Sequence, residues 1–183
     1  MARQLIGKRT PIAILPLGTA NNVAKMLGIT GRPVQDLIDA WKTARCVNFD
    51  AGVAKGPWGS QCFIEGFGVG LFAETVSGLA AGKLDPAHSD GPKKVVRQVL
   101  TILKDQLTNY PSQDMMVRLD GQDVSGDYIL LEALNIRYIG PNLDLVPRAD
   151  NNDGFLDVVF VTKGQRTRLN KYLSDRINRK SRP

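Results

Sequence analysis

A glycine and a hydroxyl group lie in the segment Pro16–Asn22, between a short apolar run and a pattern typical of a helix. Backbone N–H groups at a helix N-terminus lack partners within the helix, and the helix dipole favours an anion beside them. Gly18 allows an anion to approach the backbone, and Thr19 can cap the helix and donate to a phosphate oxygen. The segment is therefore a candidate anion site, although an ordinary strand-to-helix turn with a threonine cap explains the same residues.

Other residue types that often carry chemistry give weaker signals. The chain has two cysteines and one histidine, which are too few for a zinc site built from these side chains. His88 lies in a loop-like stretch and is predicted to be a solvated histidine. The glycines of Gly66–Gly70 lack the third glycine at the required spacing and the βαβ unit of a dinucleotide-binding loop. Asp153-Gly154, taken alone, indicates a turn before a strand.

The elements that must position the candidate anion site have the pattern of an α/β fold. The apolar run over 11–17 predicts a buried strand. A helix is predicted over 20–27 with Thr19 as its N-cap, and a second helix over 33–41. Residues 1–43 therefore predict part of an α/β domain.

The remainder of the chain is richer in strand patterns. Strands are predicted over 45–53, 61–67, 115–119, 128–138 and 155–162, with a hairpin turn at Asp120-Gly121. The clearest helix covers 93–107, and a loop is predicted over 78–92. A basic helix is predicted from 166 to about 177, so the outline is an α/β part, a mostly β body with one long helix, and a basic tail.

The positive charge is concentrated at the C-terminal end. The chain has 24 basic and 18 acidic residues, a net charge of +6, and residues 163–183 alone carry +7. The rest of the chain is nearly neutral, which disfavours a nucleic-acid partner. A basic helix can rest on an anionic membrane surface, dock on another part of the protein or fray in solvent, and its narrow apolar stripe favours docking or fraying.

Two absences bear on the compartment. No apolar run approaches the roughly 20 residues of a membrane-spanning helix, and the N-terminus lacks the apolar core of a secretory signal. With so few cysteines, these features predict a cytoplasmic protein without a disulfide framework.

Three motifs, in order along the chain, are similar to those of the diacylglycerol kinase catalytic-domain family, which includes sphingosine, ceramide and bacterial lipid kinases. The segment Leu15-Pro-Leu-Gly-Thr-Ala-Asn-Asn-Val-Ala24 resembles the family's Leu-Pro-x-Gly-Thr-x-Asn-Asp-x-Ala. Gly66-Phe-Gly68 resembles the glycine pair that opens its second domain. The family's Asn-Gly…Gly-Gly…Ala-Pro-x-Ala…Asp-Gly-x-Leu-Asp-Val signature is similar to Asn135, Gly140, Pro147, Ala149 and Asp153-Gly-Phe-Leu-Asp-Val158.

The resemblance implies a fold, an activity and cofactors. Residues 1–43 would be part of an α/β nucleotide-binding domain, residues 44–165 a β-sandwich-like domain for the lipid substrate, and 166–183 a basic C-terminal helix or tail. The implied reaction is the transfer of a phosphoryl group from ATP to a lipid hydroxyl, such as that of diacylglycerol, with Mg²⁺. Contact with a membrane surface and assembly into a homo-oligomer are left open.

The resemblance also implies roles for single residues. Asp153 would orient or deprotonate the acceptor hydroxyl, and the nucleotide side would carry Gly18, Thr19, Asn21 and Asn22. Asn22 stands where the family usually has Asp, which removes a carboxylate near the phosphates. The ligands of the metal are left open.

One family motif does not occur in the sequence, the Gly-Gly-Asp-Gly-Thr nucleotide loop. The resemblance implies that the chain begins downstream of that loop, and because positioning the nucleotide stabilises the transition state, we expect weak or absent kinase activity. The alternative is a non-catalytic module that binds a lipid or an anionic surface. The related NAD kinases share the general architecture, but their second-domain motifs match this chain less well.

Overall fold

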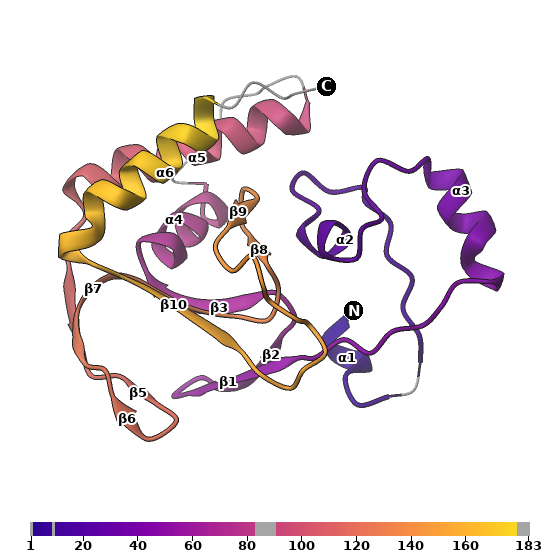
Figure 1. Cartoon of the computed structure of the whole chain (residues 1–183), viewed down its shortest axis with the longest axis horizontal. Coiled ribbons are helices and arrows are strands. Elements are labelled where there is room, and N and C mark those ends of the chain that lie inside the picture. The colour runs from indigo at the N-terminus through magenta and orange to yellow at the C-terminus, as the bar shows by residue number, and fades with distance from the viewer. Residues whose placement is uncertain (1, 9, 83–90, 179–183) are drawn as a thin grey trace. The chain divides into compact units, whose positions relative to one another are not determined.

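A computed structural model of the chain describes residues 2–8, 10–82 and 91–178 (Figure 1). The chain divides into two compact units. Unit 1 consists of residues 1–67 and 133–157, and unit 2 of residues 68–132 and 158–183. The chain leaves unit 1 after residue 67 and returns to it at residue 133, and the division into three consecutive segments stays a prediction.

Unit 1 combines short helices with two hairpins. Its elements are α1 (Ala2–Leu5), α2 (Asn22–Met26), α3 (Val34–Asp39), the 3₁₀-helix η1 (Ala40–Lys42), β1 (Gly52–Gly56), β2 (Gly59–Phe63), β8 (Tyr138–Ile139) and β9 (Leu143–Asp144). β1 pairs antiparallel with β2, Gly52 opposite Phe63, and β8 pairs antiparallel with β9, Tyr138 opposite Asp144. Helix α2 packs on β8.

The strand predicted over 11–17 is wrong. In the described part of the chain this segment has no strand partner, and Ile12 and Leu17 are 48% and 72% exposed. A strand requires backbone hydrogen bonds to a neighbour, which an apolar composition cannot supply by itself.

Helix α2 begins later than predicted. Its N-cap is Asn21, at φ 54°, and no side chain caps the helix, so the assignment of Thr19 as N-cap is wrong. Asparagine tolerates this left-handed conformation better than most residues. Beyond its C-terminus, Gly28 adopts a φ of 67°, a common way for a helix to end.

Unit 2 contains a sheet and three longer helices. The elements are β3 (Gly66–Gly70), α4 (Leu71–Ala80), α5 (Pro92–Asn109), β4 (Gln113–Met115), β5 (Arg118–Leu119), β6 (Gln122–Asp123), β7 (Gly126–Leu134), β10 (Asp157–Thr162), the 3₁₀-helix η2 (Lys163–Gln165) and α6 (Arg166–Asn178). The sheet has the order β10-β7-β3, with β4 also paired to β7. The architecture confirms the expected mixture of helices and antiparallel strands with one long helix.

Several elements of unit 2 confirm the sequence predictions. The long helix is α5, the basic helix is α6, and Asp120-Gly121 forms the turn between the antiparallel strands β5 and β6. Helix α4 was not predicted and includes the first residues of the expected loop over 78–92. Residues 83–90 of that loop, with His88, lie outside the described residues.

Helix α5 packs against both α4 and α6 (Figure 1). Leu100, Leu103 and Leu107 of α5 are buried, as is Leu173 of α6. The guanidinium of Arg166 donates hydrogen bonds to the carbonyls of Leu107 and Tyr110, so it satisfies C-terminal groups of α5. The described part of the basic tail is therefore a packed helix, and the expectation of fraying is wrong for it.

A buried carboxyl group lies in the sheet of unit 2. Glu132 on β7 is 2% exposed, and its Oε1 has no hydrogen-bond partner among the residues that the structure describes. It lies against Gly68 of β3, where a Cβ atom would come within 2.0 Å of Glu132 Oε2. Burial raises the pKa of Glu132 to about 8. The glycine thus provides the space that this side chain occupies.

No helix of residues 2–8, 10–82 and 91–178 combines the length and the apolar character that crossing a membrane requires.

Candidate functional site

The turn before α2 is closed by the side chain of Asn21. Its Oδ1 accepts a hydrogen bond from the Gly18 N–H at 2.8 Å, and its Nδ2 donates to the carbonyls of Gly18 at 2.7 Å and Pro16 at 3.1 Å. The N–H of Gly18, the residue expected to let an anion approach the backbone, therefore has a partner within the turn. Thr19 is exposed on the same turn.

Asn22 points inward rather than toward solvent. It is 5% exposed, and its Nδ2 donates to the carbonyl of Gly140 at 3.0 Å and to Glu65 Oε2 at 3.3 Å. Its Oδ1 is buried without a partner among the described residues. Asn21 thus closes the turn, and Asn22 ties α2 to Glu65 and Gly140. The nucleotide contacts that the family resemblance implies for both residues stay a prediction.

A group of charged and polar side chains joins α2 to the β8–β9 hairpin. Lys25 Nζ donates to Asn142 Oδ1 at 2.7 Å and lies 5.1 Å from the centre of the Tyr138 ring. Arg137 lies 5.0 Å from the same ring and forms a two-bond ion pair with Asp144, at 2.8 and 2.7 Å. Cations near an aromatic ring are attracted by its quadrupole, so these contacts fix the helix on the hairpin.

Asp153 lies on a turn that Asp50 anchors. The Phe155 N–H donates to Asp153 Oδ1 at 2.9 Å, and the Gly154 N–H donates to Asp50 Oδ2 at 2.8 Å. The backbone of Asp50 is fixed in turn, because its N–H donates to Asn151 O and its carbonyl accepts from Asn135 Nδ2, both at 2.8 Å. Asp153 is exposed and is held in a defined conformation.

Unit 1 contains every residue that the sequence singled out for a site: Gly18, Thr19, Asn21, Asn22 and Asp153. The sequence reasoning missed the residues that support them, Asp50, Glu65, Lys25 and Asn142. One signal was available, because Glu65 lies within the strand predicted over 61–67, and a carboxyl that a strand partly buries requires a partner. Nothing in the sequence paired it with Asn22, 43 positions away.

Metal sites in proteins are built from His, Cys, Asp and Glu side chains that lie close together. Within the described ranges, no group of three or more His, Cys, Asp and Glu side chains could hold a metal ion. That absence concerns sites built from three or more such side chains, whereas Mg²⁺ in phosphoryl-transfer sites is usually held by one or two carboxylates together with the phosphates of the substrate.

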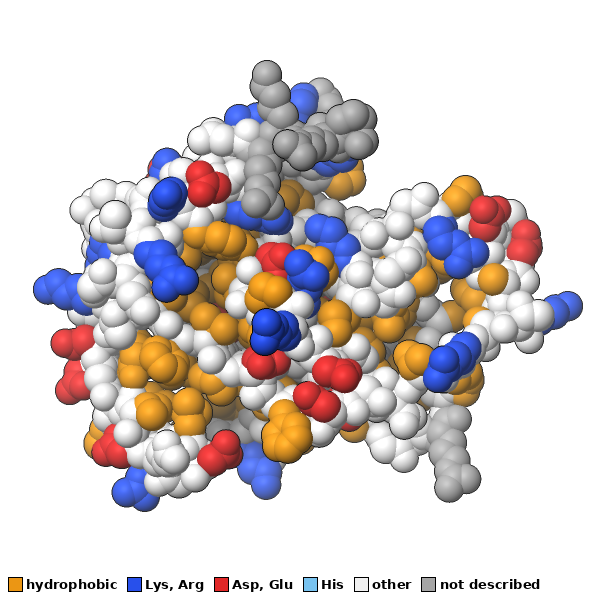
Figure 2. Space-filling view, in the orientation of Figure 1, with side chains coloured by type: hydrophobic (Ala, Val, Ile, Leu, Met, Phe, Trp, Pro, Cys, Tyr) orange, Lys and Arg blue, Asp and Glu red, His pale blue; other side chains and the backbone are white. Residues whose placement is uncertain are grey.

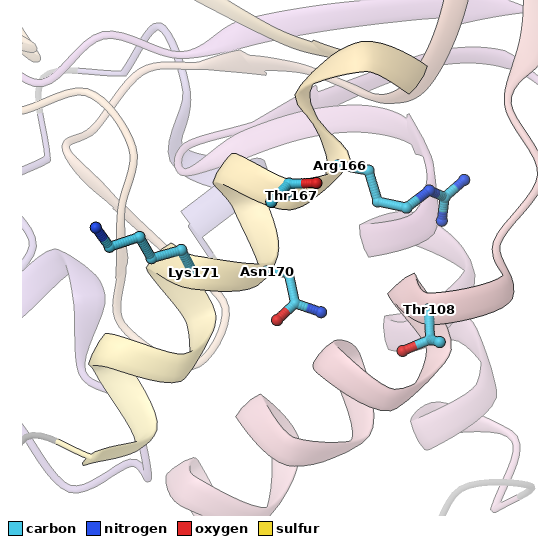
Figure 3. A pocket seen from close by; sticks show the side chains of 5 residues that line it. All are labelled: Thr108, Arg166, Thr167, Asn170 and Lys171. Atoms are coloured by element: carbon cyan, nitrogen blue, oxygen red, sulfur yellow. The ribbon is translucent and has the colours of Figure 1, made fainter.

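Unit 2 carries a shallow depression between the end of α5 and the start of α6. It has a volume of about 340 Å³ and is lined by Thr108, Arg166, Thr167, Asn170 and Lys171 (Figure 3). Figure 3 shows Asn170 extending toward α5 and Lys171 extending away from it. Because the Arg166 guanidinium already binds carbonyls of the chain, its charge serves the packing of the helices.

Helices α5 and α6 carry most of the positive charge of unit 2. Lysine and arginine side chains lie over these helices (Figure 2), and the exposed ones are Lys93, Lys94, Arg97, Arg168 and Lys171. The two helices contain only two acidic residues, Asp105 and Asp175.

Two family models match the chain, one after the other. Residues 1–54 match the model described as "Diacylglycerol kinase catalytic domain". Residues 88–178 match that described as "YegS C-terminal NAD kinase beta sandwich-like domain". Together they include more than three quarters of the chain.

Curated relatives include the "Diacylglycerol kinase" of Mycobacterium tuberculosis, 26% identical over 173 residues, which are 90% of this chain and 52% of the relative. A "Probable lipid kinase YegS-like" of Pseudomonas aeruginosa is 29% identical over 156 residues, 84% of this chain and 47% of the relative. The chain spans about half the length of the curated relatives it matches.

Solved structures share the fold. A putative diacylglycerol kinase from Bacillus anthracis matches with a TM-score of 0.68 at 22% identity, covering 93% of this chain and 52% of that one. A further diacylglycerol kinase structure from the same organism gives a TM-score of 0.61 at 21% identity.

Proposed function

We propose that this chain, which belongs to the diacylglycerol kinase catalytic-domain family, takes part in the transfer of a phosphoryl group from ATP to a lipid hydroxyl. The observation that carries the proposal is the order of the two family models along the chain, with the exposed Asp153 near the end of the second chain segment of unit 1. Diacylglycerol is the substrate that the names of the relatives favour. Since the chain spans half of each relative, the activity of a whole enzyme is itself part of the proposal.

In this proposal Asp153 orients or deprotonates the attacking hydroxyl. Its Oδ1 is held by the Phe155 N–H, and because the residue is exposed, the second carboxylate oxygen is accessible to a substrate hydroxyl. Asp50 contributes by fixing the backbone at Gly154, so that the Asp153 carboxylate keeps one orientation toward the substrate hydroxyl. A positioned base typically accelerates a reaction by about 10²- to 10⁴-fold.

ATP as donor and Mg²⁺ as its counter-ion belong to the same proposal and rest on the family. Magnesium neutralises charge on transferred phosphate groups when it is bound. The family resemblance assigns Gly18, Thr19, Asn21 and Asn22 to the nucleotide side, and the side chain of Asn21 also closes the turn that carries them. A cytoplasmic location with contact at a membrane surface follows from the substrate class and belongs to the proposal as well.

The experiment follows ³²P from the γ-position of ATP into diacylglycerol in mixed micelles, with the full chain and its Asp153→Asn variant. Asp120→Asn is a matched control, because Asp120 also precedes a glycine in a turn but lies in unit 2. We expect a low rate that falls about 100-fold or more in Asp153→Asn and stays unchanged in Asp120→Asn. Equal rates in all three chains would contradict the role of Asp153, and no transfer by any of them would contradict the kinase proposal.

A non-catalytic lipid-binding module is the second candidate, favoured by the exposed cations of α5 and α6. Each Lys or Arg near an anionic membrane surface contributes on the order of 1 kcal/mol. Flotation with phosphatidylserine vesicles would compare the chain with the variant Arg168→Gln/Lys171→Gln. The control is Lys42→Gln/Lys55→Gln, which removes two exposed cations from unit 1. A binding module loses flotation only in the first variant, whereas equal flotation of both variants contradicts this candidate.

A further inference from the structure

Asn22 stands where the resembled family usually carries Asp, and its surroundings explain how an amide fits there. The Nδ2 group faces two acceptors, the Gly140 carbonyl at 3.0 Å and Glu65 Oε2 at 3.3 Å. Both contacts require a donor, which an ionised carboxylate cannot provide. Because the side chain is 5% exposed, water cannot easily take the place of the lost bonds.

Glu65 supplies the carboxyl group of this contact. It lies between β2 and β3, and its backbone carbonyl accepts from the N–H of Asn135, which fixes the main chain at this point. Burial raises the pKa of Glu65, and the hydrogen bond from Asn22 acts in the opposite direction. The amide of Asn22 is therefore a partner that favours the ionised form of Glu65.

The other charged groups of this contact are already paired. Lys25 binds Asn142, and Arg137 binds Asp144. Asn22 is thus the side chain that connects α2, and with it the Gly18–Asn22 turn, to both Glu65 and the β8–β9 hairpin.

We propose that Asn22 and Glu65 form a matched amide–carboxylate pair that positions the Gly18–Asn22 turn, with the carboxyl on residue 65 instead of residue 22. The turn's place on the nucleotide side rests on the proposed function, whereas the pairing rests on the contacts alone. Restoring the family's Asp at position 22 is therefore harmful in this chain. An aspartate at position 22 would place its carboxylate beside that of Glu65. It would also face the Gly140 carbonyl, which is a further acceptor without a donor.

The test is a double-mutant cycle of four full-length chains: the unchanged chain, Asn22→Asp, Glu65→Gln and the double variant. Asn48→Asp, an exposed position in unit 1, controls for the added negative charge. Thermal unfolding is measured at pH 5 and pH 8, and the KM for ATP and kcat are measured in the transfer assay.

At pH 8 we expect Asn22→Asp to lower Tm by about 5 °C or more and to raise the KM for ATP about tenfold, with a smaller effect on kcat. Lowering the pH to 5 should restore part of the Tm, because one of the two carboxyls takes up a proton. In the Glu65→Gln background, Asn22→Asp should lower Tm by less than half as much, and this decrease should no longer depend on pH. Asn48→Asp should leave Tm and KM unchanged.

Two results would overturn the pair: an Asn22→Asp chain as stable as the unchanged one, or an equal loss in both backgrounds. An effect on Tm with no change in KM would leave the pairing standing and overturn its role in positioning the turn. If the unchanged chain transfers no phosphate, the proposed function fails, and the stability cycle still decides whether the pair exists.

Discussion

Replacing Glu132 by glutamine should stabilise the protein in alkaline solution, because the carboxyl is buried with no charged partner in the described part of the chain. Burial is the cause of its raised pKa, from 4.5 to about 8. Between these two values the unfolded chain has released a proton that the folded chain keeps, so the folded state loses stability as the pH rises. The full loss, from below pH 4.5 to above pH 8, is about 5 kcal/mol at 1.36 kcal/mol per pKa unit.

Urea unfolding at pH 6 and pH 8 measures this effect directly. Over this interval the unfolding free energy of the unchanged chain should fall by about 2.5 kcal/mol relative to that of Glu132→Gln. The amide of glutamine introduces donors that need partners, which costs about 1–3 kcal/mol at both pH values and so leaves the difference between them intact. Glu132→Met, which has no such donors, should show the same pH difference with a higher overall stability.

The reasoning would be refuted if the unfolding free energies of the unchanged chain and Glu132→Gln differed by the same amount at pH 6 and at pH 8. It would mean that Glu132 is already ionised at pH 6 in the folded chain, with a counter-charge or water that stabilises it. If Glu132→Gln and Glu132→Met were both less stable than the unchanged chain at pH 8, the conclusion would be the same.

Three further predictions concern packing and the turn of Asp153. Gly68→Ala should destabilise the chain by about 1–3 kcal/mol in urea unfolding, because its Cβ would lie 2.0 Å from Glu132 Oε2, and shortening Glu132 to alanine should relieve part of that loss. Leu173→Ala should cost about 2–5 kcal/mol in thermal unfolding, and a loss below 1 kcal/mol would contradict the packing of α6 on α5. Asp50→Ala should slow phosphoryl transfer about tenfold or more at an unchanged KM for ATP, and an unchanged rate would show that the Gly154 contact does not matter.

The sequence predicts α5, α6 and the tight turn between β5 and β6 for local reasons, whereas it misses α4. The apolar face of α5 repeats along the helix, and Leu173 of α6 belongs to a stripe of the same period. Asp120-Gly121 forms its turn with φ values of 49° and 84°, which these two residues adopt at low cost. Such features depend on neighbours in sequence.

The candidate site could be located from the sequence only in part, because its contacts are long-range. The motifs point to Gly18–Asn22 and to Asp153, and both lie in unit 1. The direction in which Asn22 points depends on Gly140, which is 118 positions away. The turn of Asp153 is anchored by Asp50, which binds the N–H of Gly154, 104 positions away. The strand predicted over 11–17 is wrong for a similar reason, since pairing depends on a partner strand that local composition does not reveal.

The central claim, phosphoryl transfer to a lipid hydroxyl with Asp153 at the acceptor, is tested most directly by mass spectrometry of the lipids. Diacylglycerol vesicles are incubated with ATP, Mg²⁺ and the full chain, and the extract is analysed for phosphatidic acid. We predict a phosphorylated product that forms with the unchanged chain and is reduced about 100-fold or more with Asp153→Asn. Absence of the product, or equal amounts with both chains, would contradict the account.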